Sequence, residues 1–386
     1  MANALEYILW RGDISFSASP VNEVDIFLFS QLSTPDYKGI VPGDAASESI
    51  RAAADKYFAS HDESVNNLGA LQSESVLPML RMLPETARFG ALRLAGFQNR
   101  VIEEKEEQFC AVTILLPDGQ ICVSFRGTDD SIIGWKEDFH LAVKESVPAQ
   151  QDALEYLCWA ADAFPGKIIV CGHSKGGNLA VYAAVHAPIE VQKRIEQVIS
   201  FDGPGFRPGF IASEAYRTVS EKIRTVLSQN ALVGTLLNRA GEAVIVKSSV
   251  LGPMAHDGFS WEVLGCKFVR CTELSEPSQV FDRAISATLE EMSDEEKDAF
   301  VTELFDILLS TGADTVSKLT DLRLSQTYEV ARTLHKDEKV HHFTLHFLEQ
   351  MIKSIRRPQI EIPNFSHKIA EITKGRKHLP QNQKET

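Results

Sequence analysis

The chain lacks any apolar run long enough to cross a bilayer, and its N-terminus lacks a basic segment followed by an apolar one. A membrane span needs ~18 apolar residues, and a signal peptide needs both of those segments. We therefore expect a cytoplasmic protein. Cysteine is scarce, and three of the six cysteines, Cys110, Cys122 and Cys171, lie in apolar runs typical of buried strands. This placement favours reduced thiols over a disulfide framework, and the absence of a CxxC pair argues against structural zinc.

Basic residues are also in short supply, because 39 Lys and Arg face 53 Asp and Glu among 386 residues, for a net charge of −14. Nucleic-acid binding depends on clustered Lys and Arg, so nucleic acid is not expected as a partner. No P-loop is present, and no GxGxxG follows a strand, so no nucleotide cofactor is predicted. The hydrophobic content of 44% is that of a globular protein, which excludes a wholly disordered chain.

Two weak patterns near the C-terminus raise the alternatives of metal binding and of contact with anionic lipid. His342 and His346 are four residues apart and would share one face of a helix, but no third ligand accompanies them. A solvated helix face is the preferred interpretation, and no metal is predicted. Small basic clusters leave a peripheral contact with anionic lipid open; they comprise Lys353, Arg356, Arg357, Lys374, Arg376 and Lys377.

The chain divides into two predicted parts. Strand and helix patterns alternate within residues 1–276, which predicts one α/β domain with an N-terminal region 1–85 and a core 86–276. Residues 277–375 carry helical apolar stripes and predict a helical C-terminal extension, while 376–386 predict a disordered tail. The fold class is therefore α/β, with a mostly parallel central sheet and a helical C-terminal extension.

Short apolar runs mark the strands of the core. Two of them, residues 108–116 and 121–125, flank a Pro-Asp-Gly turn signal and predict a hairpin. The runs at 167–171 and 197–201 are separated by an Ala-rich helical pattern. Strands separated by helices pair in parallel, which places their carboxyl ends along one edge of the sheet.

The sharpest motif is Gly172-His-Ser-Lys-Gly-Gly177, which matches G-x-S-x-G. An apolar strand leads into it and a helix leaves it, which is the arrangement of a nucleophile elbow. Such a turn presents the serine oxygen at its apex and needs small residues on either side. Ser174 is therefore the candidate nucleophile. The alternative is a Gly-rich helix start that carries an exposed serine.

A serine nucleophile needs a base further along the chain. His256 lies in a loop that follows a core strand, in Gly-Pro-Met-Ala-His256-Asp-Gly, and is the candidate base. His186 lies within the helix that leaves the elbow, and the remaining later histidines lie in the C-terminal extension or tail. The alternative for His256 is a histidine of a surface loop.

Asp202 is the candidate acid because it directly follows the strand at 197–201 and precedes Gly-Pro-Gly. A carboxylate at a strand's carboxyl end lies on the edge where α/β sheets build their sites. The alternative is an aspartate that only shapes a turn. Asp257 adjoins His256 in the chain and is poorly placed to orient that imidazole.

The oxyanion of an acyl-transfer intermediate needs two N–H donors. The backbone of Lys175, after the nucleophile, and that of Thr128, after the strand at 121–125, are the candidates. The apolar Ile132, Ile133 and Trp135 follow in a predicted loop. They predict a lid or substrate lip, with packing onto the core as an equal alternative.

Together these motifs resemble class 3 lipases, the fungal-lipase-like branch of the α/β-hydrolases. The similarity rests on Phe125-Arg-Gly-Thr128, on Trp135 and Asp138, and on the elbow. A bacterial subgroup of predicted lipase-like hydrolases, which begins with a segment like Trp10–Asp13, is most similar, over about residues 5 to 315. The resemblance implies Ser174 as nucleophile, His256 as base, Thr128 with Lys175 as oxyanion hole, and a lipid-like ester as substrate.

One departure from that family affects the acid. Class 3 lipases carry their catalytic aspartate on a later loop, where this chain has Leu227-Ser-Gln-Asn230-Ala-Leu-Val233 without a carboxylate. Either Asp202 serves instead, which we favour, or the site is a weakened dyad.

The sequence thus predicts a serine hydrolase that cleaves carboxylic esters through a Ser-His-Asp triad and an acyl-enzyme. An acyltransferase or thioesterase would use the same residues. A binding or scaffold protein on a degenerate hydrolase fold is a third alternative, supported by the missing acid near Asn230. No cofactor is predicted, and the sequence indicates neither the physiological ester nor the oligomeric state.

Overall fold

A computed structural model describes residues 2–61, 68, 72–129, 131–310 and 315. The histidine pair His342 and His346, the C-terminal basic clusters and the predicted tail lie outside these residues.

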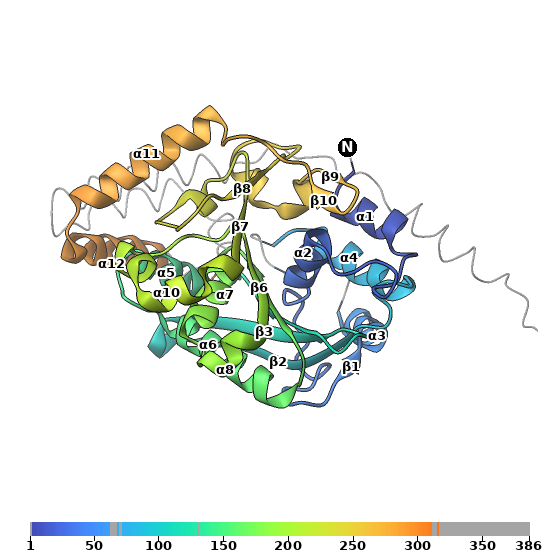
Figure 1. Ribbon diagram of the computed structural model, residues 1–386. Helices are drawn as coiled ribbons and strands as arrows, with labels where there is room; N and C mark the ends of the chain where they lie inside the picture. The colour runs from blue at the N-terminus through green and yellow to red at the C-terminus, as the bar shows by residue number, and fades with distance from the viewer. Residues whose placement is uncertain (1, 62–67, 69–71, 130, 311–314, 316–386) are drawn as a thin grey trace, which may run out of the picture.

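A single eight-stranded sheet organises the described chain, with the strands in sequence order from β1 to β8 (Figure 1). The strands are β1 (Glu48–Ser49), β2 (Arg93–Ile102), β3 (Glu107–Leu115), β4 (Ile121–Phe125), β5 (Ile168–His173), β6 (Ile195–Phe201), β7 (Ile223–Ser228) and β8 (Val244–Val246). The pairs from β1 to β4 are antiparallel, and those from β4 to β8 are parallel. The predicted hairpin is therefore the β3–β4 pair, and the predicted mostly parallel core is confirmed.

Helices cover both faces of this sheet. One face carries α1 (Ala4–Arg11), α2 (Glu23–Gln31), α3 (Ile50–Ser60) and α4 (Val76–Met82). The other carries α6 (Pro148–Ala163), α7 (Lys175–His186), α8 (Ile189–Arg194), α9 (Pro208–Ala212) and α10 (Glu214–Val219) (Figure 1). A mostly parallel sheet with helices on both faces is the α/β class that the sequence predicts. A small hairpin, β9 (Val263–Leu264) with β10 (Lys267–Phe268), lies near α1.

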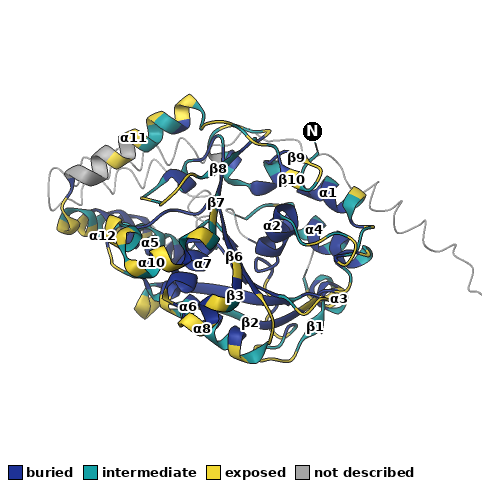
Figure 2. Cartoon of the chain, viewed as in Figure 1, coloured by how far each residue is buried: buried dark blue, intermediate teal, exposed yellow. Residues whose placement is uncertain are grey.

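Two apolar cores lie on opposite faces of the sheet. Ile169 and Cys171 of β5 belong to the core beneath α1–α4, whereas Ile168 and Val170 belong to the core beneath α6 and α7. Because side chains alternate along a strand, a strand covered on both faces is apolar throughout. Figure 2 shows this continuous burial along the central strands.

A third apolar cluster joins α5 (Ile132–His140) to α12 (Asp294–Ser310), which follows α11 (Glu276–Glu291). The predicted stripe of α12 is buried in it, at Phe300, Leu304, Ile307 and Leu308. Ser293 and Glu296 form a capping box at the start of α12, since each backbone N–H donates to the other's side chain.

One local expectation is wrong: the segment around Ile132, Ile133 and Trp135 is not a loop but the first part of α5. Ser131 precedes this helix, and its hydroxyl accepts a hydrogen bond from the N–H of Gly134 at 3.1 Å. Packing against α12, which lies more than 150 residues further along the chain, buries Ile132. The helix therefore depends on a partner that the local pattern does not show.

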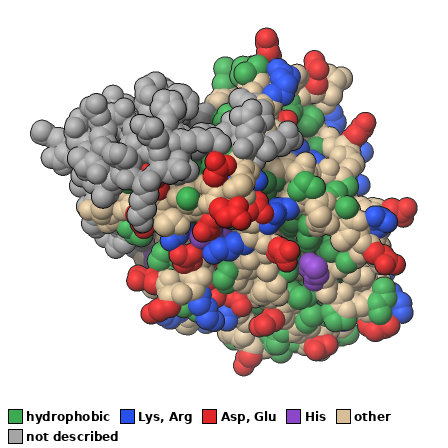
Figure 3. Space-filling model, turned by 90° about the vertical axis from the view of Figure 1, so that its left-hand side faces the viewer, with side chains coloured by type: hydrophobic (Ala, Val, Ile, Leu, Met, Phe, Trp, Pro, Cys, Tyr) green, Lys and Arg blue, Asp and Glu red, His purple; other side chains and the backbone are tan. Residues whose placement is uncertain are grey.

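In the described part of the chain, no helix has the length and apolar character that a membrane crossing requires. Acidic and basic side chains alternate over the described surface that Figure 3 presents, without a continuous basic area.

Candidate active site

Ser174 lies at the sharp turn between β5 and α7. Its backbone has φ +56° and ψ −132°, a region that side-chain-bearing residues rarely adopt. A Cβ on Gly172 would overlap the backbone of Gly176, and a Cβ on Gly176 would overlap the Phe125 carbonyl of β4. Glycine is therefore required at both positions for the turn to close against the neighbouring strand, which leaves Ser174 at the apex.

Asp202 and His256 are brought into direct contact. Asp202 immediately follows β6, and His256 ends the 3₁₀ helix η5 (Gly252–His256). His256 Nδ1 and Asp202 Oδ2 are 2.7 Å apart, with the aspartate fully buried and the imidazole 23% exposed. A carboxylate on Nδ1 holds the proton there and leaves Nε2 as the acceptor that a general base needs.

The loop that carries His256 is held at two further points. The indole N–H of buried Trp261 donates to the carbonyl of Ala255 at 2.9 Å. The carboxylate of Asp257 accepts from the Ser73 hydroxyl at 2.8 Å and from the N–H of Phe259 at 3.0 Å. Asp257 therefore shapes its own loop, in agreement with the expectation that it is poorly placed to orient the neighbouring imidazole.

The residue before the nucleophile also contacts His256. His173 Nε2 lies 2.7 Å from the carbonyl oxygen of His256, and the two imidazole rings have centroids 4.6 Å apart at an angle of 37°. Burial, together with the adjacent His256, lowers the pKa of His173 to about 3. A neutral ring beside a carbonyl oxygen must carry its proton on Nε2. This contact places the loop that carries His256 against the elbow.

Thr128 and Lys175, the candidate oxyanion donors, belong to segments that adjoin Ser174. Lys175 is the first residue of α7, and Thr128 follows β4. A Cβ on Gly127 would lie 3.0 Å from the Ser174 Cβ, so the Thr128 loop adjoins the elbow. Among the described residues, neither backbone N–H donates to a backbone carbonyl outside the helices and strands. Both groups stay candidate oxyanion donors.

The side chain of Lys175 belongs to a buried ion pair that the sequence did not reveal. Its Nζ donates to Glu137 Oε2 at 2.6 Å, to the Gln108 carbonyl at 2.8 Å and to the Gln108 side-chain oxygen at 3.1 Å. The Lys175 and Glu137 side chains are each 1% exposed. These contacts join the start of α7 to β3 and α5.

Asp138, next to Glu137 on α5, binds the other candidate donor. Its Oδ2 accepts a hydrogen bond from the Thr128 hydroxyl, and its Oδ1 lies 3.9 Å from Lys175 Nζ. Burial raises the pKa of Asp138 to about 6, although Lys175 and the Thr128 hydroxyl act to lower it. Consecutive residues of α5 therefore contact the side chains of both candidate oxyanion residues.

Asn230 lies in the segment where the resemblance to class 3 lipases would place the acid. Its side chain instead forms a hydrogen bond to the backbone. Its side-chain N–H donates to the Val250 carbonyl at 3.0 Å, in the segment that leads to η5. A carboxylate has no N–H to donate, so aspartate could not make this contact. The sequence left Asp202 as the acid or a weakened dyad open, and the structure brings Asp202 into contact with His256.

The comparison with protein families adds an assignment to this geometry. The Mbeg1-like family model matches residues 83–306, more than half of the chain. The chain belongs to the Mbeg1-like family. No curated protein sequence is significantly similar to it. The matched segment contains the elbow, Asp202 and His256. A more specific placement, in a bacterial subgroup, stays a prediction.

Several solved lipase structures are distantly similar to this Mbeg1-like chain. M37 lipase is 16% identical with a TM-score of 0.38, over 57% of this chain and 71% of that one. Rhizomucor miehei lipase in its propeptide complex is 16% identical with a TM-score of 0.36, over 67% and 74%. Lipase II from Rhizopus niveus is 12% identical with a TM-score of 0.31, over 58% and 79%. These similarities are too distant to assign an activity.

The three residues of the predicted lid or substrate lip differ in how far they are buried. Ile132 is buried against α12, and Trp135 packs against the same cluster while staying partly exposed. Ile133 is also partly exposed. This placement matches the alternative of packing that the sequence left open. A role of these residues in substrate access stays a prediction.

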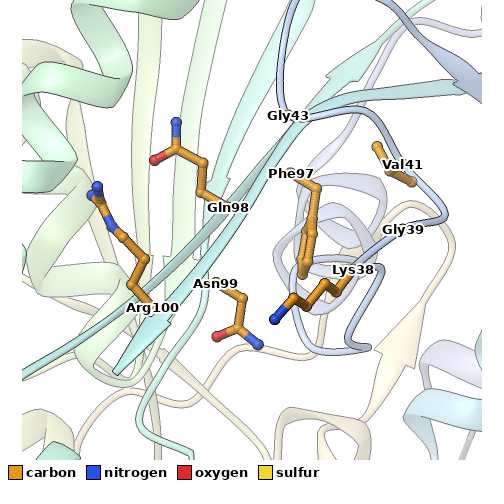
Figure 4. A pocket seen from close by; sticks show the side chains of 8 residues that line it. All are labelled: Lys38, Gly39, Val41, Gly43, Phe97, Gln98, Asn99 and Arg100. Atoms are coloured by element: carbon orange, nitrogen blue, oxygen red, sulfur yellow. The ribbon is translucent and has the colours of Figure 1, made fainter. Parts of the chain in front are cut away.

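A separate open pocket of about 400 Å³ lies between β2 and the loop at residues 38–43 (Figure 4). In Figure 4, Phe97 and Asn99 point toward the side of Lys38, whereas Gln98 and Arg100 point to the other side of the strand. Asn99 also accepts a hydrogen bond from Arg126, two residues before Thr128, at 3.0 Å. Ser174, Asp202 and His256 do not line this pocket.

The sequence did not predict that Gln72 and Ser73 contact the site. The side-chain amide of Gln72 donates to the Thr128 carbonyl at 2.6 Å, and Ser73 binds Asp257. Adjacent residues thus bind the segment that follows β4 and the loop that carries His256. No local pattern around Gln72 signals this, because its partner lies 56 residues away in the chain.

Asp138 makes a testable contribution to the pH dependence of stability. Because its pKa is higher folded than unfolded, the folded chain binds more protons between about pH 4 and pH 6. The stabilisation that Asp138 contributes is therefore lost as the pH rises through about 6. We expect Asp138→Asn to gain stability relative to the wild type across that window, measured by urea unfolding. A stability difference that is constant with pH would refute this prediction.

Proposed function

We propose that this protein is a serine hydrolase that cleaves carboxylic esters through Ser174, His256 and Asp202. One observation carries the proposal: a buried carboxylate lies 2.7 Å from Nδ1 of an imidazole whose loop is bound to a nucleophile elbow. A histidine held in this way is oriented to act as a base. The strained backbone of Ser174 supports the same role, because such strain collects at functional turns.

The geometry supports a two-step mechanism. Ser174 Oγ attacks the ester carbonyl while His256 Nε2 takes its proton, and Asp202 stabilises the imidazolium that results. The N–H groups of Thr128 and Lys175 bind the oxyanion of the tetrahedral intermediate. His256 then gives its proton to the departing alcohol, leaving an acyl-serine. Water, deprotonated by His256, attacks that acyl group, and the carboxylic acid and free Ser174 are regenerated.

The substrate class in this proposal is an apolar, lipid-like ester. Its support is the sequence resemblance to class 3 lipases and the partly exposed Ile133 and Trp135 on α5, which starts four residues after Thr128. Apolar side chains next to a site favour an apolar acyl group.

Ser174→Ala tests the function directly. We expect the wild type to hydrolyse p-nitrophenyl esters, with kcat/KM rising with acyl length, and Ser174→Ala to lose roughly 10⁴-fold or more of that activity. Ser249→Ala, at an exposed serine whose hydroxyl donates to the Ser260 carbonyl, is the matched control and should retain full activity. Equal hydrolysis by the wild type and a folded Ser174→Ala variant would refute the proposed nucleophile.

A further inference from the structure

We propose that His173 is a positioning residue that fixes the general base of the proposed site through its ring and its Nε2–H. This inference rests on the proposed function. It goes beyond the predicted triad, because the sequence assigned no role to the residue between Gly172 and Ser174.

Two independent contacts carry this inference. The Nε2–H of His173 donates to the backbone carbonyl of His256 at 2.7 Å, and the two rings pack at 4.6 Å between centroids. Asp202 contacts the same histidine at Nδ1 of its ring. The base is therefore anchored both through its backbone and through its imidazole.

The chain connectivity gives these contacts a catalytic consequence. His173 and Ser174 are consecutive, and the elbow fixes the backbone of both. The hydrogen bond from His173 to His256 thus fixes the position of the base relative to the nucleophile, because one peptide bond joins His173 to Ser174. Misplacement of a reacting group by about 1 Å can cost roughly 10²-fold in rate.

The charge state of His173 suits this role. Its pKa of about 3 keeps the ring neutral while His256 becomes an imidazolium during the reaction. A second cation at a ring separation of 4.6 Å would oppose that step. The side chain therefore supplies a hydrogen bond and a packing surface without a competing charge.

The test compares two variants of His173. His173→Phe keeps an aromatic ring but removes the donor, and we expect kcat for a p-nitrophenyl ester to fall roughly 10- to 100-fold with KM nearly unchanged. His173→Gln keeps an N–H donor and should retain more of kcat than the phenylalanine variant. His186→Phe is the matched control, because His186 contacts Tyr182 and Phe210 on α7 and α9. We expect its kcat to equal that of the wild type.

A second readout is independent of activity. The Nδ1 proton of His256, shared with Asp202, should give a downfield proton NMR signal, assigned by its loss in Asp202→Asn. We expect this signal to broaden or shift in His173→Phe and to recover in part in His173→Gln, because a loosened backbone frees the ring.

The two readouts separate the inference from the function it rests on. If the wild type hydrolyses no ester but the signal is perturbed in His173→Phe, the proposed function fails and the positioning role holds. If both His173 variants retain the wild-type kcat and the unchanged signal, the positioning role is overturned while the function stands. If His173→Phe does not fold, His173→Leu, which also lacks the N–H donor, decides by the same two measurements.

Discussion

Replacing Asp202 with asparagine is expected to lower kcat for ester hydrolysis by roughly 10⁴-fold, with little change in KM. The amide keeps the size of the side chain, but its N–H₂ group can donate to His256 Nδ1. That contact moves the imidazole proton to Nε2, so the ring can no longer accept a proton from Ser174. Because Asp202 is fully buried and 2.7 Å from His256, no water can readily replace it.

Asp257→Asn is the matched control for this substitution. Asp257 adjoins His256, but its carboxylate binds Ser73 and the N–H of Phe259. We expect its kcat to stay within a few-fold of the wild type. Steady-state kinetics on both variants, with circular dichroism to confirm the fold, provide the measurement. Wild-type turnover by Asp202→Asn would remove Asp202 from the proposed triad and favour the weakened-dyad alternative.

Replacing Lys175 with methionine is expected to lower the free energy of unfolding by about 3–5 kcal/mol. Methionine fills a similar volume but leaves the Glu137 carboxylate, which is 1% exposed, without its cation. Removing one partner of a buried pair is far more costly than removing a surface pair, because the remaining charge is already desolvated. The backbone N–H groups of Gln108 and Ala149 still bind Glu137, at 3.0 and 2.8 Å.

Urea unfolding of three variants separates burial from charge. Lys193→Met breaks the exposed Lys193–Glu190 pair and should cost at most about 1 kcal/mol. Adding Glu137→Gln to Lys175→Met removes the unpaired charge and should recover part of the loss. If Lys175→Met costs no more than Lys193→Met, the buried pair does not hold the start of α7 to α5.

The elbow and the strands around it could be predicted because their signals are local. Glycines at 172 and 176 are required by overlaps within a few residues or with the adjacent strand. The apolar runs of β5 and β6 follow from burial on both faces of the sheet. Asp202 and His256 could be singled out because each follows a core strand, and the structure places them in contact.

The contacts that surround these residues could not be predicted, because their partners are distant in the chain. Lys175 and Glu137 are 38 residues apart, and His173 and His256 are 83 apart. Lysine and glutamate usually mark exposed surface, so nothing in the sequence signals that this pair is buried. The start of α5 was missed for the same reason, since α12 buries Ile132 from the far end of the described chain.

We propose that Ser174 is a nucleophile activated by His256 and Asp202. The most direct test of this claim is covalent labelling by a fluorophosphonate, mapped by peptide mass spectrometry, because this reagent reports an activated serine whatever the natural ester. We predict an adduct on Ser174 in the wild type, much slower labelling in Asp202→Asn, and none at that position in Ser174→Ala. Folded wild-type protein that stays unlabelled at Ser174 would contradict the claim.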